Sequence, residues 1–102
     1  MDNSKKLSQQ INFQSGSVVS KEILNKTTGT ITIFAFDKDQ GLSEHKAPYD
    51  AFVMGIEGSA EITVSGTVNL VKSGESLLMP ANSLHSVRAL EPFKMLLIMI
   101  KS

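Results

Sequence analysis

The sequence predicts an all-β protein, built as an antiparallel sandwich or barrel. Many short segments carry apolar residues at alternate positions, which is the pattern of half-buried strands. Turn-forming Gly, Pro, Asn and Asp residues separate these segments at regular intervals. No segment of ten residues or more shows a convincing helical period. Short, regularly spaced strands joined by such turns are typical of sandwiches and barrels.

Composition limits both the domain organisation and the partners. A chain of 102 residues predicts one domain with a single core. Ten Lys and Arg residues balance ten Asp and Glu residues, so no charged surface is expected for nucleic acid or an anionic membrane. The absence of cysteine excludes disulfides, zinc–thiolate sites and thiol nucleophiles. The polar start does not resemble a signal peptide and the longest apolar run is too short to cross a bilayer, so a cytoplasmic location is expected.

The N-terminal third is expected to contain a tail and then strands. Met1 to Gln10 is polar with little to bury, which predicts a mobile tail ahead of a single domain over residues 11–102. Ile11 to Phe13 suggests a short strand, and Val18 to Leu24 a longer one. Thr30 to Phe36 alternates almost perfectly and predicts a strand with one buried face.

Further strands follow in close succession. Leu42 to Lys46 is a short extended piece that carries His45 and ends before the bend at Pro48. Ser65-Gly66 predicts a two-residue hairpin turn. The remaining expected strands are Ala51–Glu57, Ala60–Val64, Thr67–Val71, Glu75–Met79, Leu84–Leu90 and Phe93–Ile100. The alternation places these residues in the core: Ile31, Ile33, Val53, Ile62, Val64, Leu78 and Val87.

The last strand, Phe93 to Ile100, is apolar on both faces. One small barrel covers only one of those faces, so the other requires a second apolar surface. We therefore expect a homodimer, in which the segment from Ile11 to Leu24 is available to pair across subunits and hide a sheet edge.

The stretch from Gly74 to His85 carries the most specific pattern. Pro80 ends an apolar run, Asn82 suits a left-handed turn, and His85 starts the next strand. This spacing resembles the second signature of the cupin family, Gly-x5-Pro-x-Gly-x2-His-x3-Asn, with Asn82 in place of the glycine and Ala89 in place of the last asparagine. The resemblance covers roughly residues 30–100 and implies a jelly-roll cupin barrel of two facing sheets.

The first cupin signature, Gly-x5-His-x-His-x3,4-Glu-x6-Gly, is only half present. Counting back from Gly58 places His45 on the first histidine, Ala47 on the second and Ala51 on the glutamate. Gly41 stands two residues later than the signature glycine.

In cupins of this pattern, three histidines and a carboxylate hold a divalent metal inside the barrel. The resemblance therefore implies a degenerate site in which His45 and His85 bind zinc, nickel, manganese, iron or copper weakly. Both histidines are expected to converge at one end of the barrel. Glu44 and Lys46 flank His45 and should point the opposite way.

Four other residues complete the predicted ligand-binding region. Ala47 and Ala51 leave room beside the imidazoles for water or a ligand. Tyr49 lies in the same corner and offers a phenol oxygen. Asp50 should face away from the side on which Ala51 lies, unless the corner at Pro48 changes which side chains of the following strand point inward.

Two functions remain open. The first is a protein that binds a small ligand, such as a sugar or an organic acid, without a permanent metal. The second is a metal-dependent enzyme of the dioxygenase, isomerase or decarboxylase type, with His45 and His85 as ligands. A third interpretation makes the two histidines ordinary polar residues at strand ends. Four methionines, at positions 54, 79, 95 and 99, suggest soft copper ligands but are more typical of adaptable packing.

Overall fold

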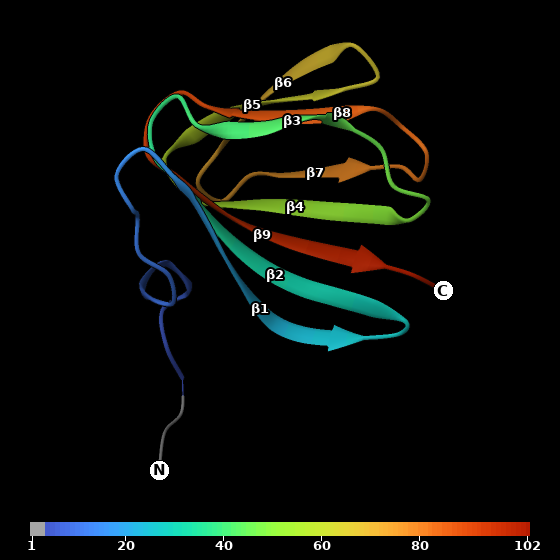
Figure 1. Ribbon diagram of the computed structural model, residues 1–102, viewed down its shortest axis with the longest axis horizontal. Coiled ribbons are helices and arrows are strands. Elements are labelled where there is room, and N and C mark those ends of the chain that lie inside the picture. Colours follow the sequence, from blue (N-terminus) through green and yellow to red (C-terminus); the bar gives the residue numbers. More distant parts are fainter. Residues whose placement is uncertain (1–3) are drawn as a thin grey trace.

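The computed structural model describes residues 4–102, and within that range the chain forms two antiparallel sheets that face each other (Figure 1). One sheet has five strands in the order β1-β2-β9-β4-β7, and the other has four in the order β3-β8-β5-β6. The elements are η1 (Leu7–Gln9, a 3₁₀ helix), β1 (Val18–Lys26), β2 (Gly29–Phe36), β3 (Gly41–His45), β4 (Asp50–Glu57), β5 (Ser59–Val64), β6 (Thr67–Lys72), β7 (Ser76–Met79), β8 (His85–Ala89) and β9 (Phe93–Ile100). The predicted antiparallel barrel of two facing sheets is confirmed.

Turn chemistry explains why the chain reverses where it does. Ser65 and Gly66 join β5 to β6 with φ values of 48° and 82°, so the predicted hairpin turn is confirmed. Asn82 has φ 65°, the left-handed conformation that asparagine tolerates better than most residues.

No helix in the described part of the chain is long and apolar enough to span a membrane.

Side chains from both sheets meet in the main core, and Ile33 belongs to a smaller buried cluster outside the five-stranded sheet. Among the predicted core residues, Ile33, Val53 and Ile62 are completely buried and Val87 is nearly so. Ile31 and Val64 are only partly buried, because Ile31 lies on the outer face of its sheet and Val64 lies at a strand end.

The prediction for Leu78 is wrong, since its side chain is 59% exposed. In β7, Met79 pairs with Ala51 of β4, and Met79 and the half-buried Leu77 pack into the core. Successive side chains point to opposite faces of a sheet, so Leu78 must face outward. The run Leu77-Leu78-Met79 has no polar residue to reveal this phase in the sequence.

The predicted strand at Ile11 to Phe13 is also wrong, because these residues form no strand. Ile11 is instead buried against the outer face of the five-stranded sheet, in a cluster with Ile33 and Ala35. The expected tail over residues 1–10 lies partly outside the described residues. Within it, η1 is ordered as a helix and the Ser8 carbonyl accepts a hydrogen bond from Lys94 Nζ, while the mobility of this segment stays a prediction.

One end of the barrel gathers the connections that matter for the site. The loop over residues 46–49 joins β3 to β4, and the loop over residues 80–84 joins β7 to β8. The two loops are tied together, because the Asn82 amide donates a 2.8 Å hydrogen bond to the Ala47 carbonyl. Figure 1 shows β4, β7 and β9 all reaching this end.

Candidate functional site

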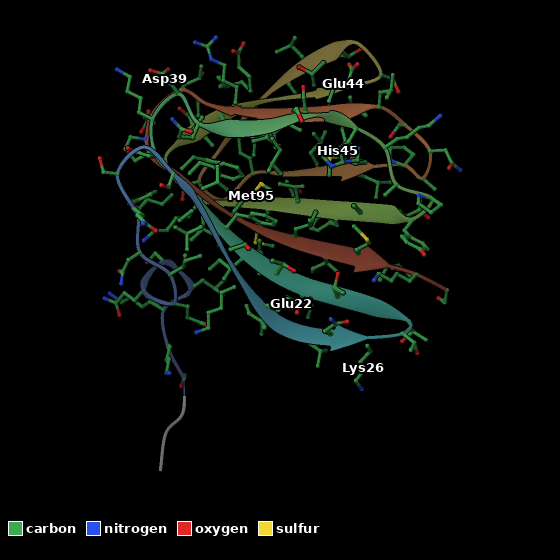
Figure 2. All side chains as sticks on the ribbon, viewed as in Figure 1. Glu22, Lys26, Asp39, Glu44, His45 and Met95 are labelled. Carbon is green, nitrogen blue, oxygen red and sulfur yellow. The ribbon has the colours of Figure 1, made fainter. Side chains whose placement is uncertain are left out.

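His45 and His85 meet on the inner side of the four-stranded sheet. They are directly opposite each other on β3 and β8, and their Nε2 atoms are 3.1 Å apart. The ring centroids lie 4.3 Å apart with the rings at 71° to each other. Figure 2 shows His45 pointing into the space between the sheets and Glu44 pointing away from it. The predicted convergence is confirmed, while the role of the pair as ligands stays a prediction.

A bulge in β3 brings His45 to this position. Leu42 pairs with Val87 and His45 pairs with His85, so three steps along β3 match two along β8. Strict alternation from the core-packed Leu42 would place His45 on the outer face. The extra residue turns the following side chains to the opposite face of the strand, so His45 points inward, and bulges near functional sites often re-aim a side chain in this way.

Backbone carbonyls orient both imidazole rings. Nδ1 of His45 lies 2.7 Å from the Ser43 carbonyl oxygen, and Nδ1 of His85 lies 3.2 Å from that of Ser83. A carbonyl oxygen can only accept, so each Nδ1 carries the hydrogen. In a neutral ring the lone pair is then on Nε2. When both rings are neutral, two Nε2 acceptors are therefore 3.1 Å apart, and either a shared proton or a bound cation would relieve their repulsion.

The environment keeps His85 uncharged near neutral pH. Burial lowers the pKa of His85 below its ordinary value of 6.5, and the nearby charge of His45 lowers it further. The hydrogen bond to the Ser83 carbonyl opposes this shift without cancelling it. A neutral imidazole is the form that binds metals, so His85 is ready to act as a ligand at pH 7.

Ala51 lies on the opposite wall of the barrel. It is 4% exposed, faces the core, and pairs with Met79 on one side and Met99 on the other. Directly opposite residues share a face, so the three side chains form one inward row. Ala47 lies in the loop after β3 and is partly buried. Neither alanine offers a ligand atom from its side chain.

Tyr49 and Asp50 are engaged elsewhere. Asp50 shares the outer face with Phe52, and its Oδ1 accepts a 2.9 Å hydrogen bond from the Ala81 amide. The Pro48 corner therefore does not bring this carboxylate to the histidines. The ring of Tyr49 lies 5.7 Å from Lys101 Nζ in a cation–π contact. Both residues hold the loops at this end in place.

The remaining donors fit a cation held by two protein ligands. Within residues 4–102, no group of three or more His, Cys, Asp and Glu side chains is arranged to hold a metal. The two Nε2 atoms are nevertheless at a separation that a single ion could span with metal–nitrogen bonds of about 2.0–2.1 Å. Closed sites have four ligands and catalytic zinc sites about three, so this pair would hold an ion weakly.

The two serine carbonyls that orient the imidazoles were not predicted from the sequence. A signal was present, because both histidines occur in the pattern Ser-x-His, as Ser43-Glu44-His45 and Ser83-Leu84-His85. In each case the ring bonds to the carbonyl two residues earlier. The shared Ser-x-His spacing indicates that both rings bond in the same way, whereas the alternation of apolar residues gives no information about this contact.

Comparison with known proteins agrees with this architecture. The family model described as "Cupin domain" matches residues 32–100. A conserved protein of unknown function from Streptococcus pyogenes is 32% identical, with a TM-score of 0.91 over 100% of this chain and 91% of the other. A cupin 2 conserved barrel domain protein from Leptotrichia buccalis is 42% identical with a TM-score of 0.90, covering 93% of this chain and 46% of that one. A cupin superfamily protein from Desulfitobacterium hafniense has a TM-score of 0.95, covering 100% of this chain and 94% of that one, and at 22% identity it shows the fold alone. No curated protein matches.

Proposed function

The chain belongs to the cupin domain family, and we propose that it binds a small polar molecule where His45 and His85 meet. A divalent transition metal, held weakly and exchangeably by the two Nε2 atoms, would link this molecule to the protein. Zinc, nickel, manganese, iron and copper all accept imidazole ligands. A sugar or an organic acid could supply the oxygen atoms that fill the remaining coordination positions.

One observation carries this proposal, namely the facing Nε2 atoms 3.1 Å apart with both Nδ1 atoms already bonded to carbonyls. Rings serving only as surface polar groups have no need of this arrangement, because water satisfies an exposed Nε2 equally well. Here the scaffold instead holds the two Nε2 atoms next to each other. His85 is also neutral at pH 7, so a cation meets no competing proton on that ring.

The same pair favours ligand binding over catalysis. A metal in the enzyme alternative would polarise a substrate oxygen or bind dioxygen. Such metals are generally fixed by about three protein ligands. Among residues 4–102, the site has two imidazoles and no carboxylate, since Ala51 stands where the family's glutamate is expected and Asp50 is bonded to Ala81.

Isothermal titration with nickel or zinc tests the proposal, using protein without a histidine tag. The wild type should bind one ion per chain, and both His45→Ala and His85→Ala should weaken binding about tenfold or more. Glu44→Gln is the matched control, because this neighbour of His45 points away from the barrel interior (Figure 2). Wild-type binding no stronger than that of the two alanine variants would reject a metal-linked site. Equal weakening in the Glu44→Gln control would reject the assignment to the histidine pair.

A further inference from the structure

Two methionines line the inner face of the five-stranded sheet at the end that carries the histidine pair. Met79 of β7 and Met99 of β9 are the neighbours of Ala51 on β4, one on each side. Directly opposite residues share a face of the sheet, and Ala51 and Met79 belong to the core, so both thioether side chains point into the barrel. Met79 is 3% exposed and Met99 is partly buried. We call Met79 and Met99 the methionine pair.

The connections between the sheets place the methionine pair opposite the histidine pair. The strand β7 ends at Met79 and β8 begins at His85, with only a short loop between them. In the same way, β3 ends at His45 and β4 begins at Asp50. A backbone hydrogen bond joins the two loops. Both pairs therefore lie at the same end of the barrel, on the inner faces of sheets that face each other.

Side chains from these two walls are long enough to meet. Facing sheets pack about 10 Å apart, and side chains from their inner faces interdigitate. Figure 2 shows His45 pointing into the space between the sheets. The side chain of Ala51 ends at Cβ, so this row places no longer side chain between the two thioethers. Two imidazole nitrogens and two sulfur atoms therefore border the same region of the barrel.

These four groups suit a soft, singly charged metal ion. Thioether sulfur is polarisable and selects Cu(I) over harder ions, and imidazole also suits copper. Zinc in proteins is bound by thiolate, imidazole and carboxylate, so a thioether adds little to its affinity. The described residues place no third His, Cys, Asp or Glu side chain beside the histidine pair, so every available ligand is neutral when the imidazoles are neutral. Burying uncompensated charge is costly, and Cu(I) brings less charge into the barrel than a divalent ion does.

We propose that the histidine pair and the methionine pair together bind the cuprous ion, Cu(I). The inference rests on the proposed function, because both use the same two imidazoles. It adds the ligands on the facing sheet and the oxidation state in which copper is held. With Cu(I), the two sulfur atoms take the positions that the oxygen atoms of a small molecule fill on a divalent ion. Cu(I) and the divalent ion with its oxygen ligand are therefore alternative occupants of one site.

An anaerobic titration of Cu(I) against bicinchoninate, a chelator that is coloured when it binds this ion, tests the inference on protein without a histidine tag. The wild type should take up one Cu(I) ion per chain. In the double variant Met79→Leu with Met99→Leu, the Cu(I) dissociation constant should rise about tenfold or more, while the nickel dissociation constant should change by less than about twofold. X-ray absorption at the copper edge should show sulfur ligands in the wild type and none in the double variant.

Met95→Leu is the matched control, because Met95 also faces the barrel interior but pairs with Gly55, farther from the histidine end (Figure 2). It should leave the affinity for both ions unchanged. Leucine is apolar and close to methionine in volume, so the variants should fold, and circular dichroism checks this.

The two proposals fail in different ways. A double variant that binds Cu(I) as tightly as the wild type, or that loses no more affinity than Met95→Leu, would overturn the inference. A wild type that binds nickel but not Cu(I) would also overturn it, and would leave the proposed function intact. A wild type that binds neither ion would overturn both.

Discussion

Replacing Ala51 by glutamate should make folding depend on a divalent metal. The residue is 4% exposed and faces the barrel interior, so a carboxylate there loses most of its hydration. Leaving a buried polar group without a partner costs about 1–3 kcal/mol, and we take about 2 kcal/mol because the barrel end is partly open. For a domain of this size, that loss lowers the melting temperature by about 8–16 °C in a metal-free buffer.

Metal should reverse this loss in the Ala51→Glu variant. The carboxylate would face the wall that carries His45 and His85, and a third ligand would strengthen the weak metal binding proposed for the two imidazoles. Metal at about a hundred times the dissociation constant stabilises the folded state by about 2.7 kcal/mol, which is enough to offset the substitution. Adding Ala47→His should strengthen binding again, because it restores a second missing ligand.

Thermal unfolding followed by circular dichroism, with and without nickel, measures this effect. Ala51→Gln is the matched control, since it has the same size and no charge, and nickel should leave its melting temperature nearly unchanged. The variant with both Ala51→Glu and His85→Ala should also lose the rescue. If nickel raises the melting temperature of Ala51→Glu no more than that of Ala51→Gln, position 51 does not face the histidine pair and the assigned register is incorrect.

Three further predictions concern stability. His85 has a lowered pKa in the folded state, so its contribution to stability is complete above the unfolded value of 6.5 and is lost as the pH falls through the folded pKa. Urea unfolding between pH 8 and pH 5 should therefore show a smaller loss of unfolding free energy for His85→Gln than for the wild type. Ser65 adopts φ 48° in the turn before Gly66, so Ser65→Asn should stabilise the hairpin by up to about 1 kcal/mol, and an unchanged urea midpoint would contradict this. Ile62 is completely buried, so Ile62→Ala should cost about 2–5 kcal/mol in the same assay, whereas Val68→Ala should change stability by less than about 0.5 kcal/mol.

The fold was predictable where alternation and turn chemistry agree. The segment from Thr30 to Phe36 alternates clearly, and Ser65-Gly66 between two alternating segments favours a hairpin turn. The prediction was wrong where no polar residue shows which side chains of a strand face outward. Leu77-Leu78-Met79 is apolar throughout, so only the pairing of Met79 with Ala51 determines which side chains face inward.

The proximity of the two histidines was predictable from the sequence, but the strand geometry that produces it was not. The spacing around Gly74, Pro80 and His85 identified one imidazole, and counting back from Gly58 identified the other. The bulge in β3 that turns His45 inward has no counterpart in the sequence pattern. The expectation for Asp50 depended on a corner whose effect on strand phase could not be calculated, and hydrogen bonding to Ala81 now accounts for that carboxylate.

The energetics of the histidine pair indicate why it should bind a cation at all. If both imidazoles are neutral and protonated on Nδ1, their Nε2 atoms are two acceptors 3.1 Å apart that repel each other, and burial adds a cost for charging His85. His45 is exposed and could turn toward water to relieve this repulsion. Its hydrogen bond to the Ser43 carbonyl and the bulge in β3 hold it in place instead. The scaffold thus keeps two imidazole nitrogens close together at the end of the barrel, and a shared proton or the proposed metal ion would stabilise that arrangement.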